Sequence, residues 1–308
     1  MDSEYRKGML FALGSYLIWG MMPLYVVLMI SVNPFELVGW RVFASLLIAA
    51  LLLTFMRGWK RLRALWHDKR ALAWLAASGV AILINWTTFA YAVLSERVLD
   101  TSLGYFLQPL LSVALAVVFL RERMRPLQWV AIGIMVVAVV VMIVGYGSVP
   151  IIALLLAGSF GIYGLLKKQA GKRVDALVGF TVETAATIPF SIGMIVVVAM
   201  TGGLTITEGP AYVPWLVLGF GVVTAGPLVM FASAARRLPL SVLSIMQYIA
   251  PIMSFLFGVF LLGEPMPLER LAAFALVWVA LIVFTVDTLI YAGKSRRAAR
   301  AARVEPLI

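Results

Sequence analysis

The chain contains no cysteine and a single histidine, His67, among its 308 residues. Disulfides, thiolate catalysis and cysteine metal sites are therefore excluded, and one histidine cannot build a histidine metal cluster. Charged residues make up 13%, against about 25% in soluble proteins. The longest polar break, residues 57–70, is read as a loop, so no separate soluble domain is expected. No GxxxxGK[ST] sequence occurs, so ATP is not used directly, and neither a cofactor nor a metal is indicated.

What the chain has instead is apolar sequence, 63% of its residues, arranged in long runs. A membrane-spanning helix needs about 20 predominantly apolar residues, and ten segments qualify. The N-terminal residues show no small-residue cleavage site and are expected to lead into a retained first helix. The predicted spans are residues 8–30, 35–56, 72–94, 99–120, 126–147, 150–167, 175–200, 212–235, 240–262 and 268–292.

The net charge of +11 is distributed unevenly over the loops. With the N-terminus inside, 22 of the 25 Lys and Arg residues fall in inside regions, two (Arg97 and Arg270) fall outside and Arg41 lies within a helix. The positive-inside rule therefore predicts cytoplasmic termini and an even number of spans. Basic loops at a membrane surface contact anionic lipid head groups, so membrane lipids are expected partners and nucleic acid is not.

The chain also resembles itself. Residues 89–124 align with residues 231–266 at an offset of 142, and the matches include Ser102 with Ser244, Pro109 with Pro251 and Glu122 with Glu264. Residues 37–40 align with residues 177–180 at an offset of 140. Because each repeat would hold five helices, the second must enter from the opposite side. We predict an all-α integral membrane fold of two inverted five-helix repeats, residues 1–147 and 148–292, followed by a basic cytoplasmic tail, residues 293–308.

Several motifs, in their order and spacing, carry a resemblance to a known family over essentially the whole chain. They are Trp19-Gly20-Met21-Met22-Pro23-Leu24-Tyr25, Asn85-Trp86, Leu103-Gly104-Tyr105-Phe106-Leu107-Gln108-Pro109-Leu110, Ser159-Phe160-Gly161-Ile162-Tyr163-Gly164 and Gln247-Tyr248-Ile249-Ala250-Pro251. Together they resemble the RarD branch of the EamA-type transporters, in the drug/metabolite transporter superfamily. The resemblance implies a central cavity and export of small amphipathic drugs or metabolites across a bacterial inner membrane. The branch often carries a chloramphenicol-permease label, which is a weak guide to substrate.

Paired prolines indicate where a substrate would bind. Pro109 and Pro251 occupy equivalent positions about ten residues into their helices, which is about 15 Å deep. Paired interruptions in the two halves of a transporter indicate a substrate site, although simple bends for packing remain an alternative. Tyr105 and Gln108 share the face of Pro109, and Gln247 shares that of Pro251. These amides are expected to point inward, toward substrate or toward neighbouring helices.

Aromatic side chains at mid-helix depth add to the candidate cavity. Trp19, Trp86, Tyr163 and Tyr248 lie away from the interfaces, where aromatic belts form. Stacking on a drug-like substrate and tight core packing both explain them. Asn85 is a midplane amide that is a candidate hydrogen-bond donor to substrate or a structural group.

Arg41 and Glu183 are the two clearest charges inside the predicted spans. Arg41 is about 9 Å from the outside and Glu183 about 12 Å from the inside. Glu183 is a candidate carrier of a coupling proton, and Arg41 is a candidate for binding an anionic group or a carboxylate. Structural anchoring is the alternative for both. Glu122 and Glu264, at helix ends, are expected to make exposed capping or gating contacts, and Gly133 is a candidate for close helix packing.

Together these features favour a non-enzymatic secondary exporter of small molecules, with protons a candidate coupling ion. The expected location is the bacterial inner membrane, with multiple spans. A flippase for lipids or lipid precursors is the main alternative. A membrane enzyme and a non-transporting scaffold are weaker ones, since catalytic clusters of His, Asp or Cys do not occur.

Overall fold

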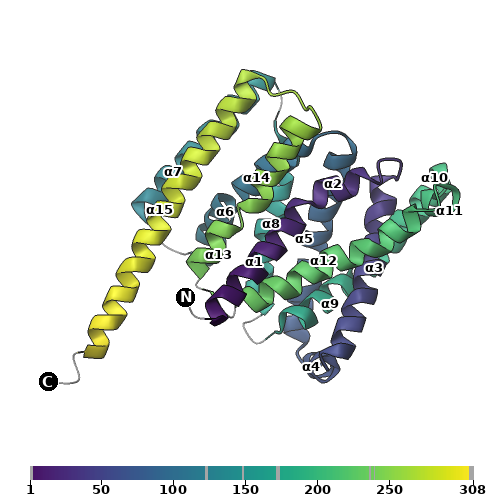
Figure 1. The fold of residues 1–308 in the computed structure, drawn as a ribbon, viewed down its shortest axis with the longest axis horizontal. Helices are drawn as coiled ribbons and strands as arrows, with labels where there is room; N and C mark the ends of the chain where they lie inside the picture. The colour runs from purple at the N-terminus through teal and green to yellow at the C-terminus, as the bar shows by residue number, and fades with distance from the viewer. Residues whose placement is uncertain are drawn as a thin grey trace.

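The computed structural model describes residues 3–121, 124–147, 149–170, 174–235, 237–238 and 240–304. These residues form helices and connecting loops, without a strand among them (Figure 1). The first half of the chain contains α1 (Ser3–Gly20), α2 (Met22–Val27), α3 (Pro34–Phe55), α4 (Trp59–Leu65), α5 (Lys69–Leu94), α6 (Val98–Leu120) and α7 (Pro126–Tyr146). The second half contains α8 (Ile151–Ala170), α9 (Ala176–Ala186), α10 (Ile188–Gly202), α11 (Thr205–Glu208), α12 (Val213–Ala235), α13 (Leu240–Met246), α14 (Ile249–Leu256), the π-helical turn η1 (Phe257–Leu261) and α15 (Leu268–Val304).

Local signals in the sequence explain where several helices begin. Asn33 accepts a hydrogen bond from the backbone N–H of Phe35 at the start of α3, and Pro34 follows it. Asp68 and Asp175 cap α5 and α9 in the same way. Such residues satisfy N–H groups that have no partner within the helix, which fixes the first turn.

The helices are long and apolar enough to cross a membrane. Among the described residues, eight helices pass on length and composition, and α9 with α10 adds a ninth span bent by 44°. The apolar segment of α13, α14 and η1 accounts for the remaining predicted span, residues 240–262. The chain therefore fits a ten-helix inverted-repeat membrane fold, as the sequence predicted.

Three predicted spans are interrupted. The first divides at Met21 just before Pro23, and the seventh bends at Thr187 just before Pro189. Residues 240–262, predicted as one helix, break at Gln247 and Tyr248, between α13 and α14. Pro251 has no N–H to donate to the carbonyl of Gln247, so the helix loses a hydrogen bond at the break.

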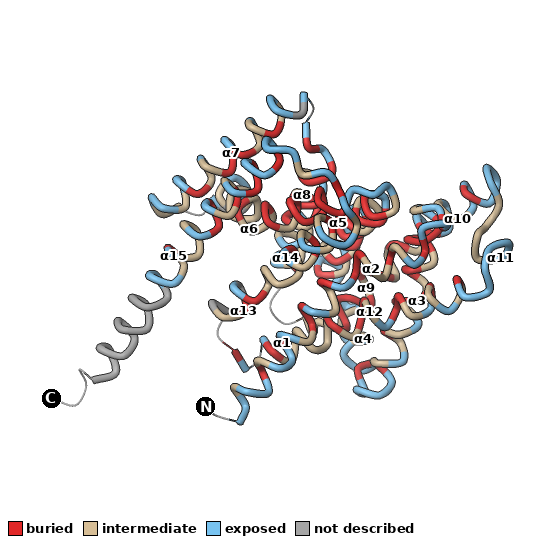
Figure 2. Tube along the Cα trace, turned by 45° about the horizontal axis from the view of Figure 1, so that its top comes forward, coloured by how far each residue is buried: buried red, intermediate tan, exposed pale blue. Residues whose placement is uncertain are grey.

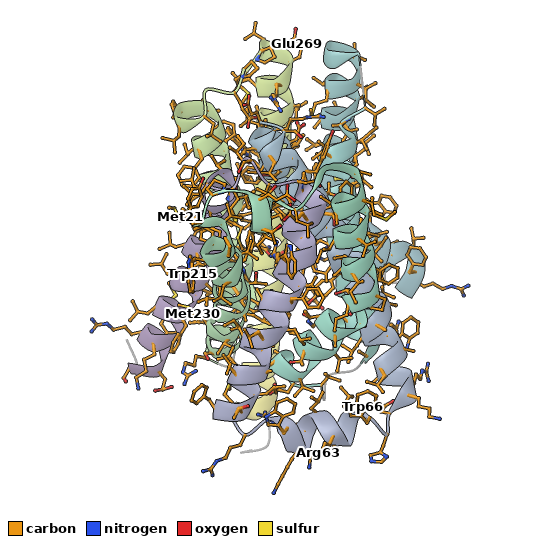
Figure 3. The ribbon with its side chains drawn as sticks, turned by 90° about the vertical axis from the view of Figure 1, so that its right-hand side faces the viewer. Met21, Arg63, Trp66, Trp215, Met230 and Glu269 are labelled. Carbon is orange, nitrogen blue, oxygen red and sulfur yellow. The ribbon has the colours of Figure 1, made fainter. Side chains whose placement is uncertain are left out.

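Two connections also differ from expectation. Residues 57–70, predicted as a loop, include the short helix α4, and α15 continues from the last span into the predicted tail. Both segments are rich in Lys and Arg, which have high helix propensity, and such residues can continue a helix beyond the apolar region. Figure 3 shows Arg63 and Trp66 of α4 at one end of the bundle and Glu269 of α15 at the other.

Packing between helices repeats when the two halves are exchanged. Helix α5 of the first half packs on α8 of the second, and correspondingly α12 of the second half packs on α1 of the first. The pairs α6 with α8 and α14 with α1 correspond, as do α3 with α12 and α9 with α5. The pair α7 and α15 stands side by side at one edge (Figure 1). This correspondence is what a duplicated five-helix unit produces.

Two glycines allow the corresponding crossings to be tight. A Cβ on Gly79 of α5 would lie 2.4 Å from the carbonyl oxygen of Glu183, and one on Gly221 of α12 would lie 2.4 Å from that of Ala44. Positions 79 and 221 are separated by the same 142 residues as the sequence repeat. Gly133, in contrast, has no heavy atom within 4 Å of an added Cβ, so the close packing expected there is wrong.

The outer surface is apolar. Phe55, Met200, Phe260 and Trp215 are each at least 74% exposed, although large apolar side chains in such numbers are unusual on a protein surrounded by water. Figure 2 shows buried residues gathered around α5 and α8 in the middle of the bundle, with exposed residues on the outward faces. A lipid environment accounts for this pattern because the hydrocarbon replaces water around the exposed side chains.

Candidate substrate site between the two halves

Arg41 lies in the interior, where both halves meet. Its side chain extends from α3, and only 5% of the residue is exposed. The guanidinium carbon lies 4.2 Å from the ring centroid of Trp86 on α5 and 4.7 Å from that of Phe220 on α12. Trp86 belongs to the first half and Phe220 to the second, so the cation is held between aromatic rings of both.

The surroundings of Arg41 leave its charge uncompensated. Within the described part of the chain no carboxylate lies within 4.0 Å of it, and its Nε has no hydrogen-bond partner. Burying a charge in a membrane helix costs roughly 2.5–3.5 kcal/mol on insertion scales. Cation–π contacts return about 0.5–2 kcal/mol. The cation–π contacts therefore do not offset the whole cost of burying the charge, and a bound anion would offset the rest.

Two hydroxyl groups near this site also lack partners. Ser45 lies one turn after Arg41 on α3, and Thr224 lies one turn after Phe220 on α12. Both hydroxyl oxygens are buried, and neither has a hydrogen-bond partner in the described part of the chain. The Ala44–Gly221 crossing holds these two helix faces together. Buried polar groups in folded proteins are nearly always satisfied, so a cluster of exceptions calls for an explanation.

Glu183 lies in a different environment, where it is fully satisfied. The residue is 1% exposed. Its carboxylate accepts hydrogen bonds from the Ser78 hydroxyl at 3.0 Å and the Tyr163 hydroxyl at 3.3 Å, and it pairs with the Lys167 ammonium at 3.1 Å. Glu183 therefore pairs with Lys167 of α8, and no contact joins it to Arg41 among the described residues.

The helices that carry the two prolines, α6 with Pro109 and α14 with Pro251, are in contact across the halves. The Ser102 hydroxyl of α6 donates to the carbonyl oxygen of Pro251 at 2.8 Å. The two helices pack together, although α6 stays continuous through Pro109. Pro251 is buried and Pro109 is half-buried, as are Gln108 and Gln247. The repeat thus brings both prolines to the interface between the halves.

Of the remaining predicted residues, Tyr105 lies close enough to Arg41 for an electrostatic interaction, and Asn85 and Trp19 have other neighbours. Asn85 is buried, and its amide donates to the Leu156 carbonyl at 3.0 Å and the Ser159 hydroxyl at 3.1 Å, both on α8. Trp19 packs against Phe231, and Tyr105 packs against Phe89, with ring centroids 6.0 and 6.1 Å apart. In this structure Asn85 therefore has the contacts of a structural group.

Tyr248 lines an apolar cavity of about 340 Å³ between α6, α14 and α15. Phe106 and Trp278 form part of its wall, and the exposed side chain of Ile282 places its mouth at the apolar outer surface. This cavity is separate from the Arg41 site, because Arg41 is not among its lining residues.

Ion pairs between the halves differ in burial. Arg270 pairs with Asp100 at 2.6 Å, with 8% and 6% of the side chains exposed, among loops predicted to lie outside. Glu264 accepts hydrogen bonds from the backbone N–H groups of Val98 and Leu99, so it caps α6. On the predicted inside, Arg61 pairs with Asp175 and Arg237 with Glu4, and these pairs are more exposed.

Glu264 is buried, and not exposed as the sequence suggested, because the carboxylate turns inward onto the start of α6. Its burial raises the pKa of the carboxyl above the ordinary value, and the N–H donors of α6 oppose that rise. Glu122, its counterpart in the repeat, lies outside the described residues.

Four charged residues of these networks were missed by the sequence reading: Glu36, Asp100, Lys167 as a partner of Glu183, and Asp287. Glu36 is completely buried and caps α11 through the N–H groups of Thr205 and Ile206. Asp287 pairs with Arg125 between α15 and α7. The position of Glu36, Asp100 and Asp287, each a carboxylate near the end of a span, could have marked them as candidates. Their partners in the other half could not be found in this way, because each of these partners lies far along the chain.

Comparison with known proteins agrees with this geometry. The fold, the apolar outer surface and the buried contacts between the two halves define a multi-pass helical membrane protein. The model of the EamA-like transporter family matches residues 6–144 and 148–286. The chain belongs to this family, and hence to the drug/metabolite transporter superfamily, so it is a membrane transporter of that type; the family is one of transporters and not of enzymes.

Relatives match over nearly their full lengths. Protein RarD of Streptomyces exfoliatus is 39% identical, covering 98% of this chain and 95% of the relative. An "Uncharacterized transporter" of Vibrio cholerae is 37% identical, covering 98% of each. Protein RarD of Escherichia coli is 37% identical, covering 94% of this chain and 97% of the relative. The resemblance to the RarD branch is thereby confirmed.

Proposed function

We propose that this transporter is a secondary exporter of small amphipathic drugs or metabolites in the bacterial inner membrane, with both termini in the cytoplasm. The observation that carries the proposal is the Arg41 site, which takes Trp86 from one half and Phe220 from the other. A site made by both halves changes when the halves move against each other. Aromatic rings and a single charge suit an amphipathic substrate.

Alternating access is the proposed mechanism. The buried Arg270–Asp100 pair and the Glu264 cap join the halves on the predicted outside, while the pairs on the predicted inside are more exposed. Ion pairs open to water contribute little to stability, whereas buried ones are strongly destabilised when one partner is removed. The molecule thus has the features of a carrier closed toward the outside. Pro109 and Pro251 would let α6 and α14 flex as the outer contacts separate.

Transport by the purified protein in liposomes tests the proposal. A screen with candidate drugs and metabolites, chloramphenicol among them, is run with and without a pH gradient. Pro109→Ala combined with Pro251→Ala should abolish transport while the protein still inserts, because both helices regain their missing hydrogen bonds. Gly133→Ala, at an open position on α7, is the matched control and should transport normally. Wild-type transport by the double proline variant would exclude the prolines from the mechanism.

Reporter fusions test the orientation. A reporter placed after residue 65 should report the cytoplasm, and one placed after residue 205 should report the outside, because basic loops are retained on the cytoplasmic side. The reverse pattern would overturn the proposed direction of insertion.

A flippase is the second candidate, and the cavity beside Tyr248 favours it. Its wall is almost entirely apolar, and it opens at the surface that faces lipid. A fluorescent short-chain phospholipid in the same liposomes distinguishes the two: movement of the lipid between leaflets without transport of any soluble compound would support the flippase.

A further inference from the structure

We propose that Arg41 binds a carboxylate or similar anionic group of the transported molecule, and that Trp86 and Phe220 stack on the apolar part next to that group. This inference rests on the proposed transport function and specifies its substrate class: amphipathic organic anions with an aromatic or flat apolar portion. The guanidinium would replace its missing counter-ion with the anion of the cargo.

The first argument is the charge balance of the interior. Of the two charges singled out from the sequence, Glu183 is neutralised by Lys167, and Arg41 has no carboxylate partner among the residues that the structure describes. A structural arginine at this depth would be expected to pair with an acidic side chain or with backbone carbonyls. Arg41 instead keeps a buried Nε without any hydrogen-bond partner.

The second argument is the set of donors around it. The guanidinium of arginine presents donors in a planar fork that matches a carboxylate. The unsatisfied hydroxyls of Ser45 and Thr224 lie one turn from Arg41 and Phe220 on the two packed helices. Hydroxyl groups can donate to an anion oxygen, so one bound carboxylate could satisfy groups from both halves.

The third argument is the pair of rings that encloses the cation. The guanidinium carbon of Arg41 lies over the rings of both Trp86 and Phe220, so a bound anion with an apolar portion would meet the cation and both rings at one place. With 5% of Arg41 exposed, the site is closed in this conformation. Entry of an anion therefore requires the halves to separate, which ties binding to the alternating movement.

A purely structural cation–π contact is the competing explanation, and matched ligands separate the two. Indole-3-acetate and benzoate are compared with indole-3-acetamide and benzamide, which have nearly the same shape without the charge. Binding to the purified full-length protein in detergent is measured by the rise in its unfolding temperature with ligand concentration. The carboxylates should bind roughly tenfold to a hundredfold more tightly than their amides.

Variants then assign the preference to Arg41. Arg41→Gln should abolish the preference for the carboxylate, and Arg41→Lys should retain part of it, because lysine keeps the charge without the fork. Arg63→Gln, on the exposed helix α4 at one end of the bundle (Figure 3), is the control and should keep the full preference. Thr224→Val should weaken carboxylate binding by a smaller factor and serves if Arg41→Gln does not fold.

Equal binding of carboxylates and amides, no binding by any pair, or an undiminished preference in Arg41→Gln and Arg41→Lys would overturn the inference. Because binding is measured in detergent, the result is independent of transport. Selective binding without transport in liposomes would defeat the proposed function and leave the anion site standing. Transport without any anion preference would leave the proposed function standing and defeat the anion site.

Discussion

Two helix crossings in this protein have the same backbone arrangement and opposite charge. At one, Gly79 of α5 lies against the backbone of Glu183 on α9; at the other, Gly221 of α12 lies against the backbone of Ala44 on α3. Ser78, which precedes Gly79, donates to the carboxylate of Glu183. Phe220, which precedes Gly221, stacks on Arg41. Equivalent positions in the repeat thus support an anion in one half and a cation in the other.

The difference teaches which part of a duplicated fold is free to diverge. Backbone contact at the glycines is shared, because the crossing angle and distance of the helices depend on it. The polar side chains around the crossing are not shared: the anionic crossing is neutralised internally by Lys167, while Arg41 at the cationic crossing contacts the rings of Trp86 and Phe220. An internally complete site and an incomplete one suggest different roles, proton handling for the first and ligand binding for the second.

The largest expected effect comes from removing the charge at the anionic crossing. Glu183→Gln should eliminate any dependence of transport on a pH gradient, because an amide cannot carry a proton between the two sides. Uptake of a transported compound into liposomes, with and without an imposed gradient, measures this. Gradient dependence equal to that of the wild type would exclude Glu183 as the proton carrier.

Next in size is the contrast between the two cations. Lys167→Met should lower the free energy of unfolding by about 3 kcal/mol, since it leaves the buried carboxylate of Glu183 without its counter-ion. Arg41→Met should change it by less than about 1 kcal/mol, because losing the cation–π contact is offset by no longer burying a charge. Equilibrium unfolding in mixed micelles measures both. Equal losses would mean that Arg41 has a compensating partner.

The smallest effect concerns the shared glycines. Gly79→Ala and Gly221→Ala should each lower the free energy of unfolding by about 1–3 kcal/mol, because the added methyl group would meet a carbonyl oxygen at 2.4 Å. Gly133→Ala has open space around it, so alanine should stabilise its helix by about 0.5–1 kcal/mol. A large difference between the losses at Gly79 and Gly221 would argue against equivalent crossings.

Much of the fold could be predicted from composition and periodicity. The spans follow from the apolar runs, and the helix starts at Pro34 and Pro126 follow from proline and capping residues. The break at Gln247 and Tyr248 was not predicted, although Pro251 was singled out. Pro109, in the equivalent position, leaves α6 continuous, so a proline alone does not specify a break. A proline weakens a helix locally, and the neighbouring helices decide whether the helix breaks there.

The candidate site, like the fold, was predictable from the sequence only in part. Arg41 and Glu183 were identifiable because a charge inside an apolar run is costly wherever the run packs. Their neighbours were not, since Arg41 meets Phe220 of the other half of the chain. Which group Asn85 meets was likewise decided by packing, because its amide donates a hydrogen bond to the Leu156 carbonyl on α8.

The sequence by itself determined a ten-span helical membrane protein, its repeat and the two charges that had to be buried, because hydrocarbon forces every backbone polar group into internal hydrogen bonds and penalises each charge. Tertiary structure alone decided that Glu183 has a partner and Arg41 has none among the described residues. That outcome depends on which helix faces meet at Gly79 and Gly221, and contacts between distant segments are fixed only by packing.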